Sequence, residues 1–503
     1  MNVPPVRVAG HGQDAHGDGR TTGFQPVASH GQDAHDTNLG HVMRIGMSPR
    51  NLLLSRTSRM NVPRAFRPWL VMGRMPMIRR SVLGKILLTV IAITVVANTS
   101  FAFLEYTGNN LGFAGTHNLF DRGSWVGRWN PSLLDRSGAP HWSMNLLSFG
   151  LQIGNNTLSR NDYQRLFTRG DGFWTPDEKR EILGQIPGDR LRAYFMGNVT
   201  GIGTSIDRFA LNVVVLGAGR AAVPKDFVAL ALYGDELNKS YSLASIEGSG
   251  WAAISTEVSI GKRLEWHYFD EFAVGATFRY LYGLGYGGIM RSDGQVMVTQ
   301  TGVTGNGYFE GGYGTIGDGV GLDLAASALW DEKWEFGMTI GNLIGTIAWD
   351  LDSVRVYSFD VTHGEVDIDS LHDNEYLGRL FNKTDTTYGG GTAKTRLPLF
   401  IQLNAARRIN DRLIAIAEYR QGFADKPGVS QFPRLSVGGQ YQALPWLPVR
   451  LGLAVGGEFA LEFGGGFGLD FGSYSFDFGI EGLKGFFGGS HGIGIGISNR
   501  LAF

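Results

Sequence analysis

The last thirteen residues of the chain read HGIGIGISNRLAF, from His491 to Phe503. Successive side chains of a β-strand point to opposite faces of the sheet. From 493 onward the odd positions carry mostly large apolar side chains, whereas the even positions carry glycine, serine, arginine and alanine. The alternation predicts a β-strand with one apolar face and one small or polar face.

The two segments before this strand repeat the pattern with larger side chains. Residues 459–471 (FALEFGGGFGLDF) and 474–481 (YSFDFGIE) place aromatic and aliphatic groups on one face and glycine or carboxylates on the other. A soluble core would need a second layer of equal size to bury so many rings, whereas lipid covers them directly. The segments are therefore predicted to be transmembrane β-strands.

Composition supports a large barrel. The 503 residues include 74 glycines and 12% aromatics, and the mean hydropathy is −0.06, because half of every barrel strand is polar. A helical membrane protein would show several apolar runs of about 18 residues. Alternating segments recur from His141 to the C-terminus. We predict an all-β fold, a transmembrane antiparallel β-barrel of about 14 strands, or alternatively 16.

The N-terminal region has the features of an export signal. An apolar run at 86–97 follows Arg79, Arg80 and Lys85 and precedes small residues at Ser100 and Ala102, the spacing typical of a cleaved signal peptide. We predict a signal peptide at 77–102 and a mature chain that starts near Phe103. The alternative, a single membrane anchor, needs about 20 apolar residues.

The residues ahead of that signal are not expected in the mature protein. Residues 1–76 contain HGQDAH twice and MNVP at residues 1 and 60, and a signal peptide has to emerge first. A translation start at Met77, or nearby at Met72 or Met75, is the preferred interpretation. Residues 1–76 are expected to be disordered and to lie outside the fold.

The predicted mature chain has two parts. Residues 103–140 show no alternation and are rich in aromatic and turn residues, which predicts an N-terminal plug or hatch segment; the barrel then extends from 141 to 503. Two stretches, 161–187 and 224–234, favour short helices in loops. Charged residues within strands are expected on the lumen face or at the rims, paired with one another, since each would cost roughly 2–4 kcal/mol at the lipid midplane.

Signals for chemistry are weak. The glycine-rich run 314–321 has no helix after it, as a phosphate loop requires. The acidic stretch 365–375 lacks the glycine of a calcium loop. The histidines of the predicted mature chain have no metal-ligand spacing, and the chain has no cysteine, which excludes disulfides and thiolate sites. We predict no enzyme activity, no cofactor and no metal site; a serine hydrolase assembled across strands is the alternative.

The predicted mature chain resembles the outer-membrane long-chain fatty-acid transporter (FadL-type) superfamily, particularly its PorV-like and uncharacterised branch. The similarity is carried by LGFAG at 111–115 and WNPSLL at 129–134, which correspond to a glycine-rich segment and an Asn-Pro-Ala-Gly-Leu motif. Ser132 replaces the alanine, and the glycine before leucine is missing. The resemblance implies a 14-stranded barrel with a plug.

The resemblance and the aromatic hatch together favour transport or binding of hydrophobic small molecules, with the segment from Gly112 to Leu134 folded into the lumen. The candidate ligand-binding residues are Phe113, Phe120, Trp125, Trp129, Asn130 and Pro131. Two alternatives stay open: a PorV-like barrel that shuttles or docks a secreted protein, and a structural barrel without transport.

The terminal phenylalanine suggests how the chain is assembled. The last strand of a bacterial outer-membrane barrel is expected to close against the first and to be recognised by the barrel-assembly machinery, so Ile495, Ile497, Leu501 and Phe503 are predicted to form that signal. The expected location is the outer membrane. The expected partners are outer-membrane lipid, the assembly machinery, and a hydrophobic ligand or a secreted protein. The net charge of −1 gives no indication of nucleic-acid binding.

Overall fold

The computed structural model describes residues 106–167, 174–233, 238–299, 302–364, 382–424, 430–485 and 487–503. Several sequence-based predictions lie outside these residues. They are the untranslated or removed segment 1–76, the signal peptide 77–102, the mature start near Phe103 and the acidic stretch 365–375.

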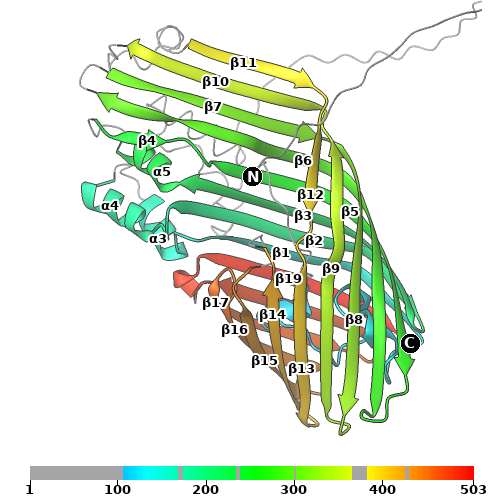
Figure 1. The fold of residues 1–503 in the computed structure, drawn as a ribbon. Helices are drawn as coiled ribbons and strands as arrows, with labels where there is room; N and C mark the ends of the chain where they lie inside the picture. Colours follow the sequence, from blue (N-terminus) through cyan, green and yellow to red (C-terminus); the bar gives the residue numbers. More distant parts are fainter. Residues whose placement is uncertain are drawn as a thin grey trace, which may run out of the picture. The chain divides into compact units, whose positions relative to one another are not determined.

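Fourteen antiparallel strands close into a ring, because β1 pairs with β2 on one side and with β19 on the other (Figure 1). In ring order the strands are β1 (Trp142–Asn155), β2 (Arg190–Ile206), β3 (Phe209–Pro224), β5 (Glu247–Leu264), β6 (Glu271–Thr299), β8 (Ile316–Trp330), β9 (Trp334–Asp350), β13 (Phe400–Asn410), β14 (Leu413–Gly422), β15 (Arg434–Leu444), β16 (Leu447–Gly456), β17 (Ala460–Asp470), β18 (Tyr474–Leu483) and β19 (Gly492–Ala502). The predicted all-β antiparallel barrel is confirmed.

The two ends of the ring differ in their connections. At the end that holds the C-terminus, turns are short, such as 207–208 between β2 and β3 and 331–333 between β8 and β9. At the other end, α3 (Arg160–Phe167) and α4 (Pro176–Gln185) lie between β1 and β2, and α5 (Lys225–Leu232) follows β3. Short turns face the periplasm in outer-membrane barrels. We therefore name these ends the periplasmic end and the outer end.

The helices form where the sequence predicted them. Thr175 and Glu178 make a capping box, in which each side chain accepts a hydrogen bond from the other's backbone N–H, and Pro176 is the first helical residue of α4. This arrangement satisfies donors that a helix start otherwise leaves unpaired. Within the described part of the chain, no helix is both long and apolar enough to cross a membrane.

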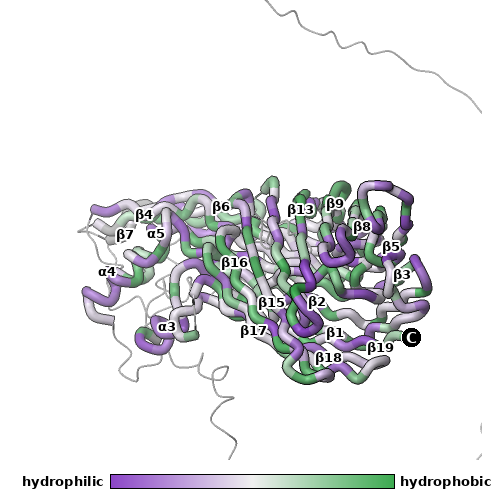
Figure 2. Tube along the Cα trace, turned by 90° about the horizontal axis from the view of Figure 1, so that it is seen from below, coloured by the Kyte–Doolittle hydropathy of each residue, from purple (hydrophilic) through white to green (hydrophobic). Residues whose placement is uncertain are grey.

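The outward face of the ring is apolar. On β3, Phe209, Leu211 and Val213 are exposed, whereas Ala210 and Asn212 between them are buried. Figure 2 shows hydrophobic and hydrophilic positions interleaved along the strands. Exposed apolar side chains on so many strands would be unfavourable in water and are the expected surface of a lipid-facing barrel.

The last residue completes the ring at the periplasmic end. The Phe503 backbone N–H donates to the Trp142 carbonyl oxygen at 2.9 Å, and the Trp142 N–H donates to the Phe503 carbonyl oxygen at 3.1 Å. The two rings are stacked with centroids 5.5 Å apart. Phe503 therefore pairs with the start of the first strand, and its role in assembly stays a prediction.

The same sheet continues beyond the ring through the long strand β6, and we call this part the outer sheet. It consists of residues 286–299 of β6 together with β4 (Ser240–Ser242), β7 (Gly302–Gly314), β10 (Ser353–Gly364) and β11 (Asn382–Gly389) (Figure 1). The short β12 (Thr392–Arg396) pairs with β9. The described residues of the weaker strand candidates, 294–299 with 302–303 and 353–363, belong to this sheet, which explains why the alternating segments outnumber the strands of the ring.

The residues before β1 fold into the lumen. We call residues 106–135 the hatch; it contains α2 (Gly108–Leu111) and the 3₁₀ turns η3 (Ser124–Arg128) and η4 (Pro131–Asp135). Lumen-facing glycines let the hatch backbone approach the wall: a Cβ on Gly452 would lie 2.1 Å from the Phe113 carbonyl carbon, and one on Gly464 would lie 2.1 Å from the Ala114 nitrogen. The glycine-rich inner face of these strands is thus the surface on which the hatch rests.

Candidate functional site

An apolar cluster forms the core of the hatch. Phe113, Trp125 and Trp129 are buried in it, and Phe120 packs against its edge beneath the Arg408 guanidinium, 5.1 Å from the ring centroid. The other members are Leu119, Val126, Leu133, Leu134, Ala210, Ala406 and Ile416. The four aromatic residues predicted as ligand contacts are thus brought together, but they mainly attach the hatch to β3, β13 and β14.

Asn130 and Pro131 have a local structural role. The Asn130 side chain accepts a hydrogen bond from the Ser132 backbone N–H at 3.2 Å and caps η4, whose first residue is Pro131. The Ser132 hydroxyl donates to Ser327 on the wall at 2.8 Å. A Cβ on Gly275 would lie 2.4 Å from the Ser132 nitrogen. The WNPSLL segment is therefore a capped turn pressed against the barrel wall.

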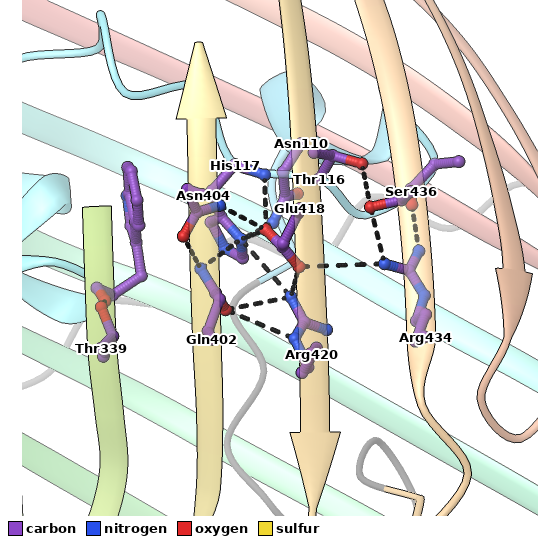
Figure 3. Close-up of polar contacts among 12 residues, drawn as sticks. Asn110, Thr116, His117, Thr339, Gln402, Asn404, Glu418, Arg420, Arg434 and Ser436 are labelled. Atoms are coloured by element: carbon purple, nitrogen blue, oxygen red, sulfur yellow. Dashed lines mark hydrogen bonds and ion pairs between the residues drawn. The ribbon is translucent and has the colours of Figure 1, made fainter. Parts of the chain in front are cut away.

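His117 lies at the centre of a buried polar network between hatch and wall (Figure 3). Its backbone N–H and its ring Nδ1 both lie 3.0 Å from Glu418 Oε2, and its Nε2 lies 3.3 Å from the Asn110 amide nitrogen. A carboxylate only accepts hydrogen bonds, so we assign the proton to Nδ1 and let Nε2 accept from Asn110. Burial lowers the pKa of His117 below its ordinary value.

Glu418 connects this histidine to a series of charges on the wall. Its carboxylate accepts from the Asn404 amide at 2.9 Å and from Arg420 at 2.5 Å, and it lies 3.8 Å from Arg434. Arg434 in turn pairs with Glu462 at 2.7 Å. The hatch is thereby tied to β13, β14, β15 and β17 through groups that have little contact with solvent.

Two further sets of ion pairs hold the other parts of the hatch. Arg128 lies 3.1 Å from Glu257, which also lies 3.4 Å from Arg279 on β6. Near the periplasmic end, Arg122 lies 2.7 Å from Glu335. Removing one partner of a buried pair leaves an uncompensated charge at a cost of about 3–5 kcal/mol. The docked hatch is therefore fixed at several separate points.

The predicted inward charges and ion-pair ladders are confirmed for most strand arginines. Arg279, Arg420, Arg434 and Arg450 are buried and each faces a carboxylate. Arg407 lies near the periplasmic rim, the other predicted location, with its guanidinium on the outside, 4.8 Å from the Trp334 ring centroid. Sequence reasoning missed the His117 network itself. The only signal for it in the sequence was one histidine, His117, in the segment predicted to fill the lumen, together with acidic residues on strands that were predicted to point inward.

An apolar cluster on the outer side of the hatch joins residues of the lumen wall to two hatch residues, Tyr106 and Leu111. We call this set the outer lumen cluster; it includes Trp251, Tyr286, Trp349, Leu351 and Phe459. Its remaining members are Tyr106, Leu111, Tyr194, Met196, Val214, Leu216, Ala218, Ala253, Leu281, Ile347, Leu397 and Leu483. An aqueous pore would carry polar groups at these positions.

One pocket lies on each side of the hatch. The outer pocket, about 540 Å³ including its mouth, is bordered by Tyr106, His117, Phe432 and Phe459 among others. The inner pocket, about 690 Å³ including its mouth, is mostly polar and is bordered by Trp125 and by the periplasmic ends of β15 to β19. Of the six predicted ligand residues, only Trp125 borders either of these two pockets.

The junction of β1 and β19 is irregular beside the inner pocket. The paired register of β1 skips residues 145–148 between Met144 and Phe149. There the Asn499 side chain replaces the ladder: its Oδ1 accepts from the Leu146 N–H and its Nδ2 donates to the Leu147 carbonyl oxygen, both at 3.2 Å. Leu147 has a φ of 21° and is 66% exposed. We call this junction the seam.

Comparison with known proteins gives a family of unknown function and a set of transporters. The model of a family of unknown function, DUF5723, matches residues 134–312. A comparison with the curated proteins finds no match.

The solved structures similar to this chain include a FadL homologue of Pseudomonas aeruginosa, at 14% identity and a TM-score of 0.49, covering 80% of this chain and 100% of the other. The toluene transporter TodX of Pseudomonas putida is similar at 11% identity and a TM-score of 0.46, covering 81% of this chain and 100% of TodX. The toluene transporter TbuX of Ralstonia pickettii is similar at 12% identity and a TM-score of 0.45, covering 80% of this chain and 99% of TbuX. These are structures of the FadL type that the sequence resembles, while the barrel fold of this chain rests on its own strand pairing.

Proposed function

We propose that the protein is an outer-membrane barrel that takes up hydrophobic small molecules and is not an enzyme. The outer lumen cluster is the observation that carries this proposal. Tyr106 and Phe459 of this cluster border the outer pocket, where a ligand of low polarity gains free energy by leaving water. TbuX and TodX, named above, are toluene transporters, and toluene is itself a hydrophobic small molecule.

The geometry suggests a route. A molecule that enters from the outer end first meets Phe432 and Phe459 in the outer pocket, and the docked hatch blocks the lumen beyond it. When the hatch shifts, the molecule reaches the seam, where the Asn499 side chain bridges the interrupted ladder. Lipid contacts Leu146 and Leu147 on the outer surface there, so an apolar molecule can leave sideways without crossing the polar inner pocket.

Uptake into proteoliposomes tests the proposal, with labelled toluene and labelled oleate as probes and albumin inside the vesicles as a sink. The test variant carries Phe432→Ala and Phe459→Ala. The control carries Phe423→Ala, an exposed phenylalanine close in sequence to Phe432 that does not border the outer pocket. Saturable uptake by the parent and the control, with a raised KM in the double variant, supports the proposal. Absence of saturable uptake of both probes by the parent overturns it.

A secretion-shuttle function is the second candidate, and the outer end favours it. That end carries α3, α4, α5 and the outer sheet, which project beyond the ring and offer surface to an exported protein (Figure 1). Co-purification of one secreted protein, lost when α3 and α4 are replaced by a short loop and accompanied by no uptake of either probe, would favour the shuttle.

A further inference from the structure

The inner face of the outer sheet carries two rows of polar side chains. Residues directly opposed in antiparallel strands share a face, and the register places the rows two residues apart on each strand, so both lie on the same face. The first row is Ser242, Gln295, Asn306, Asp360 and Asn382. The second row is Asp293, Tyr308, Ser358 and Thr384. We call these nine residues the polar platform.

The platform continues the lumen wall outward. Val354 lies on the same face of β10 as Ser358 and Asp360, because the three are separated by even numbers of residues. Val354 packs against the outer lumen cluster. The wall therefore changes along the strands from apolar beside the hatch to polar beyond the ring.

The opposite face of the outer sheet is held by a hydrophobic cluster. Phe309 and Phe359 pack there against Phe227 and Leu230 of α5 and against Val296 of β6. This packing fixes the strands from behind, so the platform is a supported surface rather than a free hairpin. The space in front of it is about 1240 Å³ including its open mouth.

The chemistry of the platform fits sugar hydroxyl groups. Amide side chains both donate and accept hydrogen bonds, carboxylates accept, and hydroxyl groups do both, so the nine residues can pair with the hydroxyl groups of a sugar and donate to its ether oxygens. No lysine or arginine belongs to either row, whereas a phosphate-rich polyanion would require them. Nearby Arg291 lies 3.9 Å from Asp293 and 5.1 Å from the Tyr308 ring centroid, and so is already engaged.

Several of these groups are available for a ligand. Asp360, Asn382 and Thr384 are exposed and have no side-chain partner within the part of the chain that the structure describes. The first row crosses five strands, or about 19 Å at the usual strand spacing, a length suited to a short oligosaccharide.

We propose that the polar platform binds a neutral oligosaccharide chain. The binding site lies outside the hatch and both pockets, and it does not depend on the proposed uptake of hydrophobic molecules. It would hold a glycan at the outer end of the barrel by hydrogen bonds across five strands.

Calorimetric titration tests this proposal, using the full chain purified in an amine-oxide detergent, which has no sugar head group. The probes are maltohexaose and cellohexaose, with dextran sulfate as a polyanion. The test variant carries Asn306→Ala and Asp360→Ala. The control carries Lys383→Ala and Thr387→Ala, exposed residues on the opposite face of β11.

Binding of a neutral hexasaccharide that weakens by about tenfold or more in the test variant and is unchanged in the control supports the proposal. No binding of either hexasaccharide at millimolar concentration, binding of dextran sulfate alone, or equal binding by both variants would overturn it. Uptake of toluene should be the same in the test variant and the parent, which separates this proposal from the proposed function.

Discussion

At the scale of single residues, His117 and Glu418 form the central contact between the hatch and the barrel wall. One carboxylate oxygen accepts from the backbone and the ring of His117 and from Asn404, while the other faces Arg420. The ring of His117 also lies 4.7 Å from that of Trp129, which joins the polar network to the apolar core of the hatch. Replacing either residue should therefore loosen the hatch more than the barrel.

Glu418→Ala is expected to destabilise hatch docking by about 3–5 kcal/mol, because Arg420 is left buried without its carboxylate. His117→Ala should cost less, about 1–3 kcal/mol, because Glu418 loses the ring N–H of His117 but keeps its contacts with Asn404 and Arg420. Hydrogen exchange of the amides in residues 106–135 measures both losses. Arg407→Ala, which removes a cation on the outside, is the control, and an equal loss of protection in all three variants would contradict this ranking.

Acidification should also loosen the hatch. The pKa of His117 is lower in the docked state than in a free chain, so the undocked form takes up the proton more readily. The stabilisation is present above the free-histidine pKa of about 6.5 and is lost as pH falls below it. The protection of hatch amides, measured relative to the intrinsic exchange rate at each pH, should fall between pH 7 and pH 5 in the parent but not in His117→Gln. A pH-independent difference between the two would count against the assignment.

At the scale of elements, lumen-face glycines let the hatch seat against the strands. Gly464 and Gly465 are neighbours on β17 with opposite directions: an added Cβ meets the Ala114 nitrogen at 2.1 Å in the first case and a Leu451 methyl at 3.8 Å in the second. Gly464→Ala should therefore displace the hatch, at a cost of about 1–3 kcal/mol for overpacking, whereas Gly465→Ala should be neutral. Limited proteolysis within residues 106–135 reports the difference, and equal resistance would argue against close contact.

The closing strand gives a second prediction at this scale. Deleting Phe503 removes two backbone hydrogen bonds and a stacked ring pair with Trp142, and placing a carboxylate at Ile495 puts a charge on the lipid face. If the assembly machinery recognises Ile495, Ile497, Leu501 and Phe503, both changes should lower the amount of heat-modifiable barrel in outer membranes. Deletion of the loop residue Phe432 is the control. Normal yield of both variants would contradict an assembly role.

The strands and loops differ in how far the sequence could predict them. Period-two alternation gave β19, β18 and β17 directly, since one face meets lipid and the other meets the hatch. The same alternation could not show that β6 leaves the ring: two bulges, at Leu284 and Met290, shift its register, and a single added residue carries little sequence signal. The seam was not predicted for the same reason. The unpaired residues 145–148 of β1 and the bridging Asn499 leave little signal in the sequence.

At the scale of the whole molecule, barrel and hatch form one closed unit with an apolar lumen on its outer side. The sequence predicted a hatch and its aromatic residues, but not that Phe113 and Trp129 would be used to attach it to the wall. Which inward residues meet depends on the order and stagger of the strands, and His117 and Glu418 are 301 positions apart. Contacts of that kind are set by closure of the ring, which local patterns do not encode.

The proposed function requires the hatch to close the lumen and to move before a hydrophobic molecule can pass. The chain has no cysteine, so a hatch-to-wall disulfide can be introduced without competing thiols. The hydroxyl oxygens of Thr116 in the hatch and Ser436 on β15 lie 2.7 Å apart, which makes Thr116→Cys with Ser436→Cys a suitable lock. Ser143→Cys with Ser205→Cys, which joins β1 to β2 across paired residues, is the matched wall-to-wall control.

Uptake of labelled toluene into proteoliposomes, measured for both double variants before and after reduction, shows whether the hatch has to move. The account predicts that the oxidised hatch lock takes up no toluene, that reduction restores its uptake, and that the control transports in both states. Undiminished uptake by the fully oxidised hatch lock would contradict the account, because the lumen would then be open with the hatch in place.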